Sequence, residues 1–395
     1  MILTKVQVQD QLNKFIAKSG INELLNLMLN SLMYIERKVF LQSEEQCKNK
    51  ANGFRKTLAR GYGKILQLHI PRDRFGHFKP LIQMLLREEE DTIRTLCFEL
   101  YGKGLTTRQI GPILDKIYGK GYSSSTISKI SQTFHQELEA WRNRPLTNNF
   151  LLIYIDAIHV KVRRDTVASE AFYVVVGVRK DGRREVLAIE NMPQESATGW
   201  SMVLKKLRAR GLTDIELVVA DGLTGLENQV GVHYPKAHFQ KCVVHLKRNI
   251  LARLRKEHKQ EIMQELKKLF NTTDSSFTFG KALQQAEKIK KKWAKIYPSL
   301  KKVLASENLQ NYLTYLNYNP DIRNMIYTTN CIERLNKEFR RTLKIRNALP
   351  SVDSCLLLLS KVAFDIEQNI YSRRLYKFNN CQEFKACNNI TNLTT

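Results

Sequence analysis

The spacing of apolar residues changes at position 151, and this change constrains the fold more than any other feature of the sequence. Residues 151–162 (LLIYIDAIHVKV), 171–178 (AFYVVVGV) and 184–191 (REVLAIEN) are rich in β-branched and aromatic side chains, which favour β-strands. Asp181 and Gly182, between the second and third segments, are typical of a tight hairpin turn. We therefore expect an antiparallel sheet of three strands to begin here.

Helices and strands are predicted to alternate after this sheet. Residues 197–212 have the spacing of an amphipathic helix that Gly211 closes, and residues 215–221 (IELVVAD) indicate a buried strand. A short helix is expected near residues 222–230 and a strand within residues 236–240. The predicted order is three strands, a helix, a strand, a helix and a strand. With a final helix added, this is the element order of the α/β ribonuclease H-like fold.

The residues before position 85 are predicted to be mainly helical. Apolar residues recur at helical spacing over residues 22–42, and residues 69–80 (HIPRDRFGHFKP) are typical of a turn-rich linker. We assign residues 1–84 to an N-terminal helical region and linker.

Three further helices with tight turns between them indicate a helix-turn-helix DNA-binding domain over residues 85–147. They are expected at residues 92–104, 106–121 and 123–141. An apolar stripe on the third helix leaves Thr126, Lys129 and Gln132 pointing outward, as reading a DNA groove requires. An ordinary helical bundle is the alternative.

Positive charge is the most informative feature of the composition. The chain has 64 Lys and Arg residues against 38 Asp and Glu residues, a formal net charge of +26. This excess suits double-stranded DNA better than a small neutral substrate. Residues 151–240 carry 12 basic and 11 acidic residues, whereas residues 241–302 carry 17 and 5, so the excess lies after the sheet.

The chain after position 147 is therefore divided into four parts. Residues 148–245 form the first part of the α/β core, and residues 246–327 are an all-helical basic insertion that holds the DNA backbone. Residues 328–375 supply the final helices of the core, and residues 376–395 form a C-terminal tail. A solvated helical face is the alternative reading of the insertion.

The sequence contains no segment typical of secretion or of a membrane. Its seven cysteines are widely spaced, its N-terminus has no apolar signal core, and no stretch approaches the roughly 18 to 20 apolar residues of a membrane span. We expect a soluble cytoplasmic protein that associates with the bacterial nucleoid and not with membranes.

Three acidic residues are candidates for metal-dependent chemistry. Asp156 is predicted to end an apolar strand over residues 151–155 and Asp221 to end another over residues 217–220, so both should emerge at the same edge of one sheet. Glu333 lies on a predicted helix that Thr328, Thr329 or Asn330 can cap and that runs to about residue 346. Each acid alone is more typical of a turn or an exposed surface, but three around one point are the oxygen ligands that Mg²⁺ selects.

Basic residues surround the third acid. Helical spacing places Lys337, Arg340 and Lys344 on the same face as Glu333, where they can follow a phosphate backbone; an exposed pair of Glu333 with Lys337 is the alternative. The DNA-backbone contacts expected from this helix and from the start of the insertion are Lys247, Arg248, Arg334, Lys337, Arg340, Arg341 and Lys344.

The motifs taken together resemble a known family. The segments that carry this resemblance are, in order, YIDAIHVKVR, GVRKDGRREVLAIE, VVADGLTGL, FQKCVVHLKRN and TTNCIERLNKEFRRTLK. With them the chain resembles the bacterial insertion-sequence transposases related to the Mutator elements of eukaryotes. ERKVFL, IPRDRFGHFKP and TYLNYNPDIRNMIYTT extend the resemblance over nearly the whole chain. It implies that Asp156, Asp221 and Glu333 are a DDE catalytic triad on a ribonuclease H-like domain interrupted by an all-helical insertion.

The resemblance also implies a reaction and its partners. Two Mg²⁺ ions, for which Mn²⁺ can substitute, would support 3′ strand cleavage and strand transfer. The DNA partners would be terminal inverted repeats and a target, and joining two ends requires a homodimer or a larger assembly. A transposase-derived repressor without catalysis, and a ribonuclease H-like nuclease that cuts without joining, are the alternatives.

Four further residues are expected to support the site. Cys242 and His245 match a Cys-x-x-His motif of the family, and Trp200 matches an aromatic position. Asn330 begins the helix of the third acid. The Cys-x-x-His spacing alone suggests zinc, but no second Cys/His pair lies at a suitable distance, so a structural zinc site is not expected.

Overall fold

The computed structural model describes residues 5–42, 48–61, 64–118, 123–163, 166–346, 349–379 and 384. They fall into two compact units, one ending at Phe134 and the other beginning at His135. Within the described residues, no helix is both long and apolar enough to cross a membrane.

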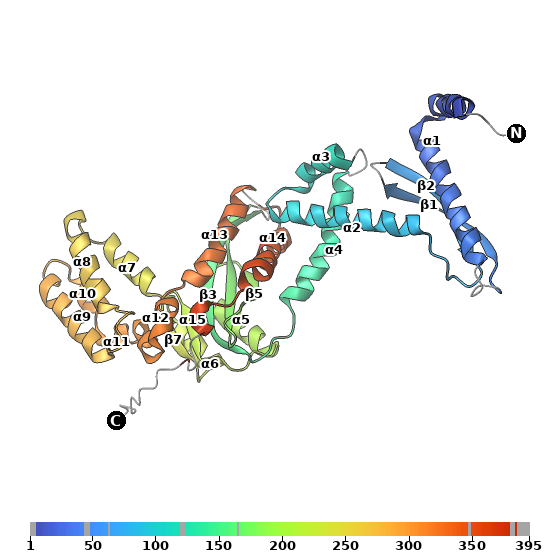
Figure 1. Cartoon of the computed structure of the whole chain (residues 1–395). Coiled ribbons are helices and arrows are strands. Elements are labelled where there is room, and N and C mark those ends of the chain that lie inside the picture. Colours follow the sequence, from blue (N-terminus) through green and yellow to red (C-terminus); the bar gives the residue numbers. More distant parts are fainter. Residues whose placement is uncertain are drawn as a thin grey trace. The chain divides into compact units, whose positions relative to one another are not determined.

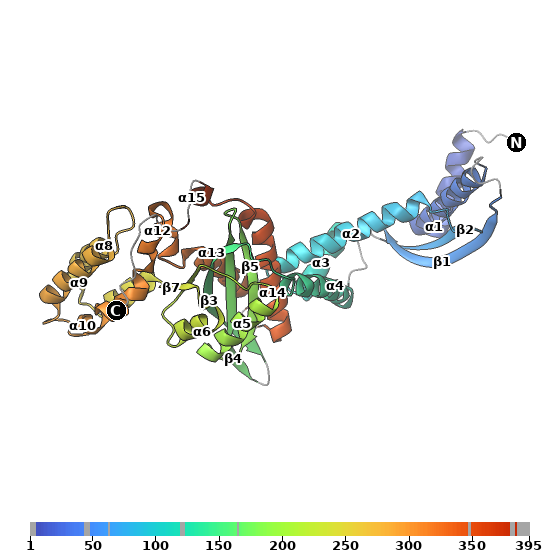
Figure 2. The same cartoon turned by 90° about the horizontal axis from the view of Figure 1, so that it is seen from below.

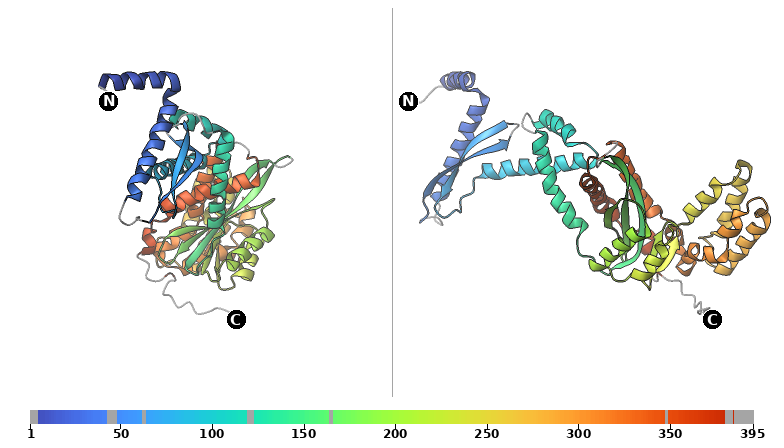
Figure 3. Two further views of the ribbon diagram at one scale, coloured as in Figure 1. Left: turned by 90° about the vertical axis from the view of Figure 1, so that its right-hand side faces the viewer. Right: turned by 180° about the vertical axis from the view of Figure 1, so that it is seen from behind.

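The first unit combines a long helix with a two-stranded sheet. Helix α1 (Lys5–Leu41) packs against an antiparallel hairpin of β1 (Ala51–Gly61) and β2 (Lys64–Asp73), as Figures 1 and 3 show. Their shared core contains Leu29, Met33, Leu66, Leu68, Ile70 and Leu86. The prediction of helix and linker alone over residues 1–84 was therefore wrong, and residues 69–73 of the expected linker belong to β2.

Three helices follow the hairpin, as the sequence predicts. They are α2 (Leu81–Gly102), which begins 11 residues before the expected start at residue 92, α3 (Thr107–Tyr118) and α4 (Ser124–Arg142). On α4, Ile127 and Phe134 are buried, Lys129 and Gln132 are exposed, and Thr126 is half-buried. The outward orientation of Lys129 and Gln132 is thus confirmed.

The second unit is built around one mixed sheet, with strand order β5-β4-β3-β6-β7. Its strands are β3 (Phe150–Arg163), β4 (Val167–Arg179), β5 (Arg184–Met192), β6 (Leu217–Ala220) and β7 (His238–Lys241). Strands β3, β4 and β5 are antiparallel, whereas β6 and β7 run parallel to β3. The predicted strands, their order and the hairpin at Gly182, whose φ is 79°, are confirmed.

Helices cover both faces of this sheet (Figure 2). The helices α5 (Ala197–Ala209) and α6 (Leu226–His233) share a core with Ile153, Ile155 and Tyr173 on one face. The helices α13 (Asn330–Lys344) and α14 (Val352–Ile366) contact β3 and β5 on the other face. Because both faces are covered, residues 150–155 of β3 and 170–178 of β4 are almost continuously buried and mostly apolar, whereas the end of β3, from Ile158 to Arg163, alternates between buried and exposed residues.

The chain between β7 and α13 is helical, as expected. It contains α7 (Val243–Ala252), α8 (Lys256–Leu269), α9 (Phe279–Trp293), α10 (Ser299–Val303), α11 (Ser306–Leu309), the 3₁₀ turns η2 (Gln310–Tyr312) and η3 (Thr314–Asn317), and α12 (Pro320–Ile326). Helices α8, α9 and α10 form a small lobe with its own buried residues, including Ile262, Leu266 and Ile289 (Figure 1). The π-turn η4 (Glu367–Tyr371) and the short helix α15 (Tyr376–Asn379) follow α14.

Candidate active site

The two aspartates lie side by side, although one of them does not end a strand. Ile155 pairs with Ala220 in the parallel register of β3 and β6, so Asp156 and Asp221, the next residues, are neighbours. Asp221 directly follows β6, as predicted. Asp156 lies inside β3, which continues to Arg163 because its second half pairs with β4. The expectation that Asp156 ends a strand was wrong, but the expected proximity is present.

Asp156 is held in a largely enclosed position. Its Oδ1 accepts a hydrogen bond from the Ala157 NH at 2.9 Å, and its Oδ2 accepts one from Asn336 Nδ2 at 2.7 Å. Burial raises the pKa of Asp156 to about 6, against the opposing effects of the Ala157 NH, the His245 charge and Asn336. Asn336 is fully buried on α13, one turn after Glu333. It was not predicted, although its helical spacing from Glu333 was an available signal.

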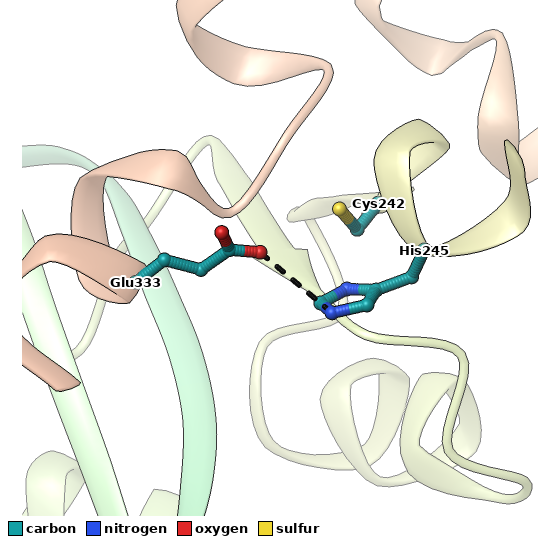
Figure 4. A group of neighbouring side chains, drawn as sticks. All are labelled: Cys242, His245 and Glu333. Carbon is teal, nitrogen blue, oxygen red and sulfur yellow. Dashed lines mark ion pairs between the residues drawn. The ribbon is translucent and has the colours of Figure 1, made fainter. Parts of the chain in front are cut away.

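His245 lies between the other two acids. Its Nδ1 is 3.5 Å from Asp221 Oδ1, and its Nε2 is 3.6 Å from Glu333 Oε1, the contact dashed in Figure 4. The pKa of His245 is raised from 6.5 to about 9. The largest cause is the interaction with the neighbouring Cys242 side chain, and the charges of Asp221 and Glu333 raise the pKa further. His245 is therefore a cation at neutral pH, placed where two carboxylates face each other.

Cys242 and Thr329 complete this side of the site. Cys242 is 1% exposed at the start of α7, and its NH donates to the carbonyl of Ala220, next to Asp221. The buried Thr329 hydroxyl lies 3.3 Å from Cys242 Sγ and 3.4 Å from Glu333 Oε1. Among the described residues, Cys242, His245 and Glu333 bring one metal-binding atom each within 4.8 Å of one another (Figure 4). The expected placement of Cys242 and His245 beside the edge that carries Asp221 is present.

The three acids suit magnesium in their chemistry. Asp156, Asp221 and Glu333 supply only carboxylate oxygens, which are the donors that Mg²⁺ prefers. Their negative charges are balanced by His245 and, more weakly, by Arg248, whose Nη2 is 3.8 Å from Glu333 Oε2.

The basic residues around Glu333 differ in exposure. Arg334, Lys337, Arg340 and Lys344 form an exposed stripe on α13, and Arg341 pairs with Glu338 at 2.7 Å. Arg248 is exposed on α7. Within the described residues, Glu333 forms ion pairs with His245 and Arg248 rather than with Lys337.

Lys247 does not belong to this exposed surface. It is partly buried, and its Nζ lies 5.4 Å from the Phe270 ring centroid and 5.8 Å from that of Tyr327. Burial lowers the pKa of Lys247 to about 8. The side chain therefore packs α7 against the ends of α8 and α12, which makes its predicted contact with DNA a poor fit.

Two of the expected supporting residues lie away from the acids. Trp200 is 1% exposed in the core on the α5 side of the sheet, where its ring meets that of Tyr173 edge-on at 4.5 Å. Asn330 is exposed at the start of α13 and lines a pocket of about 180 Å³ with Arg184 and Arg334. These positions favour a structural role for Trp200.

Residues 2–372 match the family described as transposase, Mutator family. The chain belongs to this family of transposases. It is 32% identical to the transposase for insertion sequence element IS1201 of Lactobacillus helveticus, over 88% of this chain and 93% of that protein. It is also 28% identical to the transposase for insertion sequence element IS256 in transposon Tn4001 of Staphylococcus aureus, over 95% of each chain.

Solved structures are also similar to this chain. One of them is described as a Drosophila P element transposase strand transfer complex, and it covers 73% of this transposase and 82% of its own chain at 11% identity, with a TM-score of 0.31.

Proposed function

We propose that this transposase moves an insertion sequence by metal-dependent cleavage and joining of DNA, with Asp156, Asp221 and Glu333 as a DDE triad on a ribonuclease H-like core. The observation that carries the proposal is that Asp221 and Glu333 both lie against His245, while Asp156 lies beside Asp221 in the strand register and accepts a hydrogen bond from Asn336, one turn after Glu333. The strand order and the helical insertion before the third acid agree with it.

The protein's own groups have separable tasks in this reaction. Two Mg²⁺ ions held by the triad would activate the attacking oxygen and stabilise the leaving oxygen. Asn336 and the Ala157 NH orient the Asp156 carboxylate, and Thr329 orients Glu333. First water attacks the phosphodiester at the element end and the 3′ oxygen leaves. That 3′ hydroxyl then attacks the target phosphodiester, which displaces a second 3′ oxygen.

DNA binding is assigned to exposed basic surfaces. The stripe of Arg334, Lys337, Arg340 and Lys344 leads away from Glu333 along α13, so it can position a backbone next to the acids. Lys129 and Gln132, with the half-buried Thr126, are the proposed contacts of α4 with the terminal inverted repeats. Two ends must be joined, so we also propose at least a homodimer in the complex with DNA.

The test is a supercoiled plasmid that carries both element ends, incubated with the protein and Mg²⁺. We expect 3′ nicks at the ends and joined products with the wild type, and neither with Glu333→Gln, while both proteins bind DNA equally. Glu338→Gln, on the same helix but paired with Arg341, is the matched control and should retain both steps.

The two alternative functions give different products. Cleavage without joined products would indicate a nuclease, and DNA binding without Mg²⁺-dependent cleavage would indicate a repressor. Joining by Glu333→Gln at the wild-type rate would refute the assignment of Glu333.

A further inference from the structure

We propose that Cys242, His245 and Glu333 form a second kind of metal site, selective for a thiophilic divalent ion such as Zn²⁺. We further infer, resting on the proposed role of Glu333 as a magnesium ligand, that this ion inhibits the transposase by withdrawing Glu333 from the acidic triad. The site shares one side chain with the triad but draws its other two ligands from α7 (Figure 4).

The distances are close to those of a tetrahedral ion. Zinc binds sulfur at about 2.3 Å and nitrogen or oxygen at about 2.0–2.2 Å, so neighbouring ligand atoms lie roughly 3.3–3.7 Å apart. His245 Nε2 and Glu333 Oε1 are already 3.6 Å apart. The three ligand atoms lie within 4.8 Å of one another, so any pair must approach by about 1.5 Å at most. Rotation of the partly exposed Glu333 side chain can supply this movement.

The donor set distinguishes this ion from magnesium. A thiolate, an imidazole and a carboxylate together suit zinc or cobalt, whereas Mg²⁺ takes oxygen ligands. Three protein ligands with one position left for water is the arrangement of reactive rather than structural zinc sites. This explains why the absence of a second Cys/His pair does not exclude zinc: the third ligand is an acid 88 residues after His245 (333 − 245).

The surrounding structure holds the soft ligands in place. Cys242 is fixed at the first turn of α7 by the hydrogen bond from its NH to the Ala220 carbonyl, and His245 follows three residues later on the same turn. The buried Thr329 hydroxyl lies within reach of both Cys242 Sγ and Glu333 Oε1, as outer partners of metal ligands commonly do. On binding, the thiol proton and the imidazolium proton leave to solvent.

Cobalt absorption tests the site without reference to catalysis. The full-length protein is titrated with Co²⁺ in the absence of Mg²⁺ and DNA, and the sulfur-to-cobalt charge-transfer band is recorded. We expect the wild type and Cys331→Ser to bind one Co²⁺ with this band, and added Zn²⁺ to displace it. Cys331 lies two residues before Glu333 on the same helix, which makes its variant the matched control.

Cys242→Ser should lose the charge-transfer band, and Glu333→Gln should keep it but bind Co²⁺ about tenfold or more weakly. His245→Gln, in which the thiol is retained, should also bind more weakly and provides a second variant if Cys242→Ser does not fold. A wild type without the band, or a band that survives in folded Cys242→Ser, would overturn the site.

Inhibition is measured separately, in the plasmid assay with the wild type. Low Zn²⁺ should slow cleavage at fixed Mg²⁺, and additional Mg²⁺ should restore it. Zinc that binds without slowing cleavage would overturn the inhibitory role. Failure of the proposed function appears differently, because Glu333→Gln would then cleave DNA like the wild type while the cobalt spectra remain as expected.

Discussion

Replacement of Asn336 by alanine should weaken magnesium binding without disturbing DNA binding. Asn336 is fully buried, and its Nδ2 donates to Asp156 Oδ2 at 2.7 Å, while its Oδ1 has no hydrogen-bond partner among the described residues. Within the described residues, the Asn336 side chain therefore makes one hydrogen bond, to Asp156. The variant leaves that carboxylate with the Ala157 NH as its remaining donor in the described part of the chain.

The size of the effect follows from this bond. A hydrogen bond to a charged group contributes about 1.5–3 kcal/mol. At about 1.4 kcal/mol per tenfold change, this corresponds to a roughly 10- to 100-fold loss, the same range as for other outer partners of metal ligands. We expect the Mg²⁺ concentration for half-maximal plasmid cleavage to rise by this factor.

The control is Thr342→Val, which alters another buried polar residue on α13 two turns away from Glu333. It should leave the Mg²⁺ requirement unchanged. If Asn336→Ala cleaves with the wild-type rate and the wild-type Mg²⁺ requirement, the bond to Asp156 has no role in catalysis and the placement of the first metal ligand is wrong.

Four further substitutions test other parts of the structure. Asp73 accepts hydrogen bonds from Asn49 and from the NH groups of His77 and Phe78, which outweigh burial and lower its pKa to about 2. The stabilisation that the Asp73 carboxylate provides is thus present above about pH 4 and lost as the pH falls through 2. In urea unfolding, Asp73→Asn should be less stable than the wild type by about 1–3 kcal/mol at pH 7, and this difference in free energy of unfolding should narrow in acid. Lys247→Met should bind DNA like the wild type in a salt titration, whereas Lys337→Met should reduce the slope of log affinity against log salt by about 0.9. Gly199→Ala would place a Cβ 2.4 Å from Tyr173 Oη, so thermal unfolding should report a loss of about 1–3 kcal/mol.

The large sheet could be predicted from the sequence, and the small one could not. Strands β3, β4, β5 and β6 contain apolar runs rich in β-branched residues and bounded by turn residues, which is the pattern of buried strands. Strand β1 (ANGFRKTLARG) is polar and basic, and only Leu66, Leu68 and Ile70 on its partner alternate at the strand period. Alternating apolar residues on β2 alone are too weak a signal to distinguish a hairpin of β1 and β2 from a loop.

The candidate site was predictable where it depends on the sheet. Asp156 and Asp221 come directly after Ile155 and Ala220, which pair in neighbouring parallel strands, so the two acids must lie together, and they do. The positions of His245 between two acids, of Asn336 and of Thr329 depend on how α7 and α13 pack after a long helical insertion, which no local pattern contains. The position of Lys247 could have been predicted from that of His245. The two residues are two positions apart on α7, and residues at this spacing on a helix point to nearly opposite faces.

The cation of His245 gives a final prediction about the metal-free protein. Its pKa is raised from 6.5 to about 9, so the stabilisation from its charge is fully present below pH 6.5 and is lost as the pH rises through 9. His245 is 25% exposed, and solvent screening reduces the effect to about 1–2 kcal/mol.

Chemical unfolding without metal at several pH values measures this dependence. The difference in free energy of unfolding between the wild type and His245→Gln should shrink as the pH rises from 6.5 to 9. Saturating Mg²⁺ should also reduce that difference at pH 7, because an ion between Asp221 and Glu333 does the same electrostatic work as the imidazolium. A difference that is constant with pH would show that His245 carries no stabilising charge, and the acids would then need another explanation for facing each other without a metal.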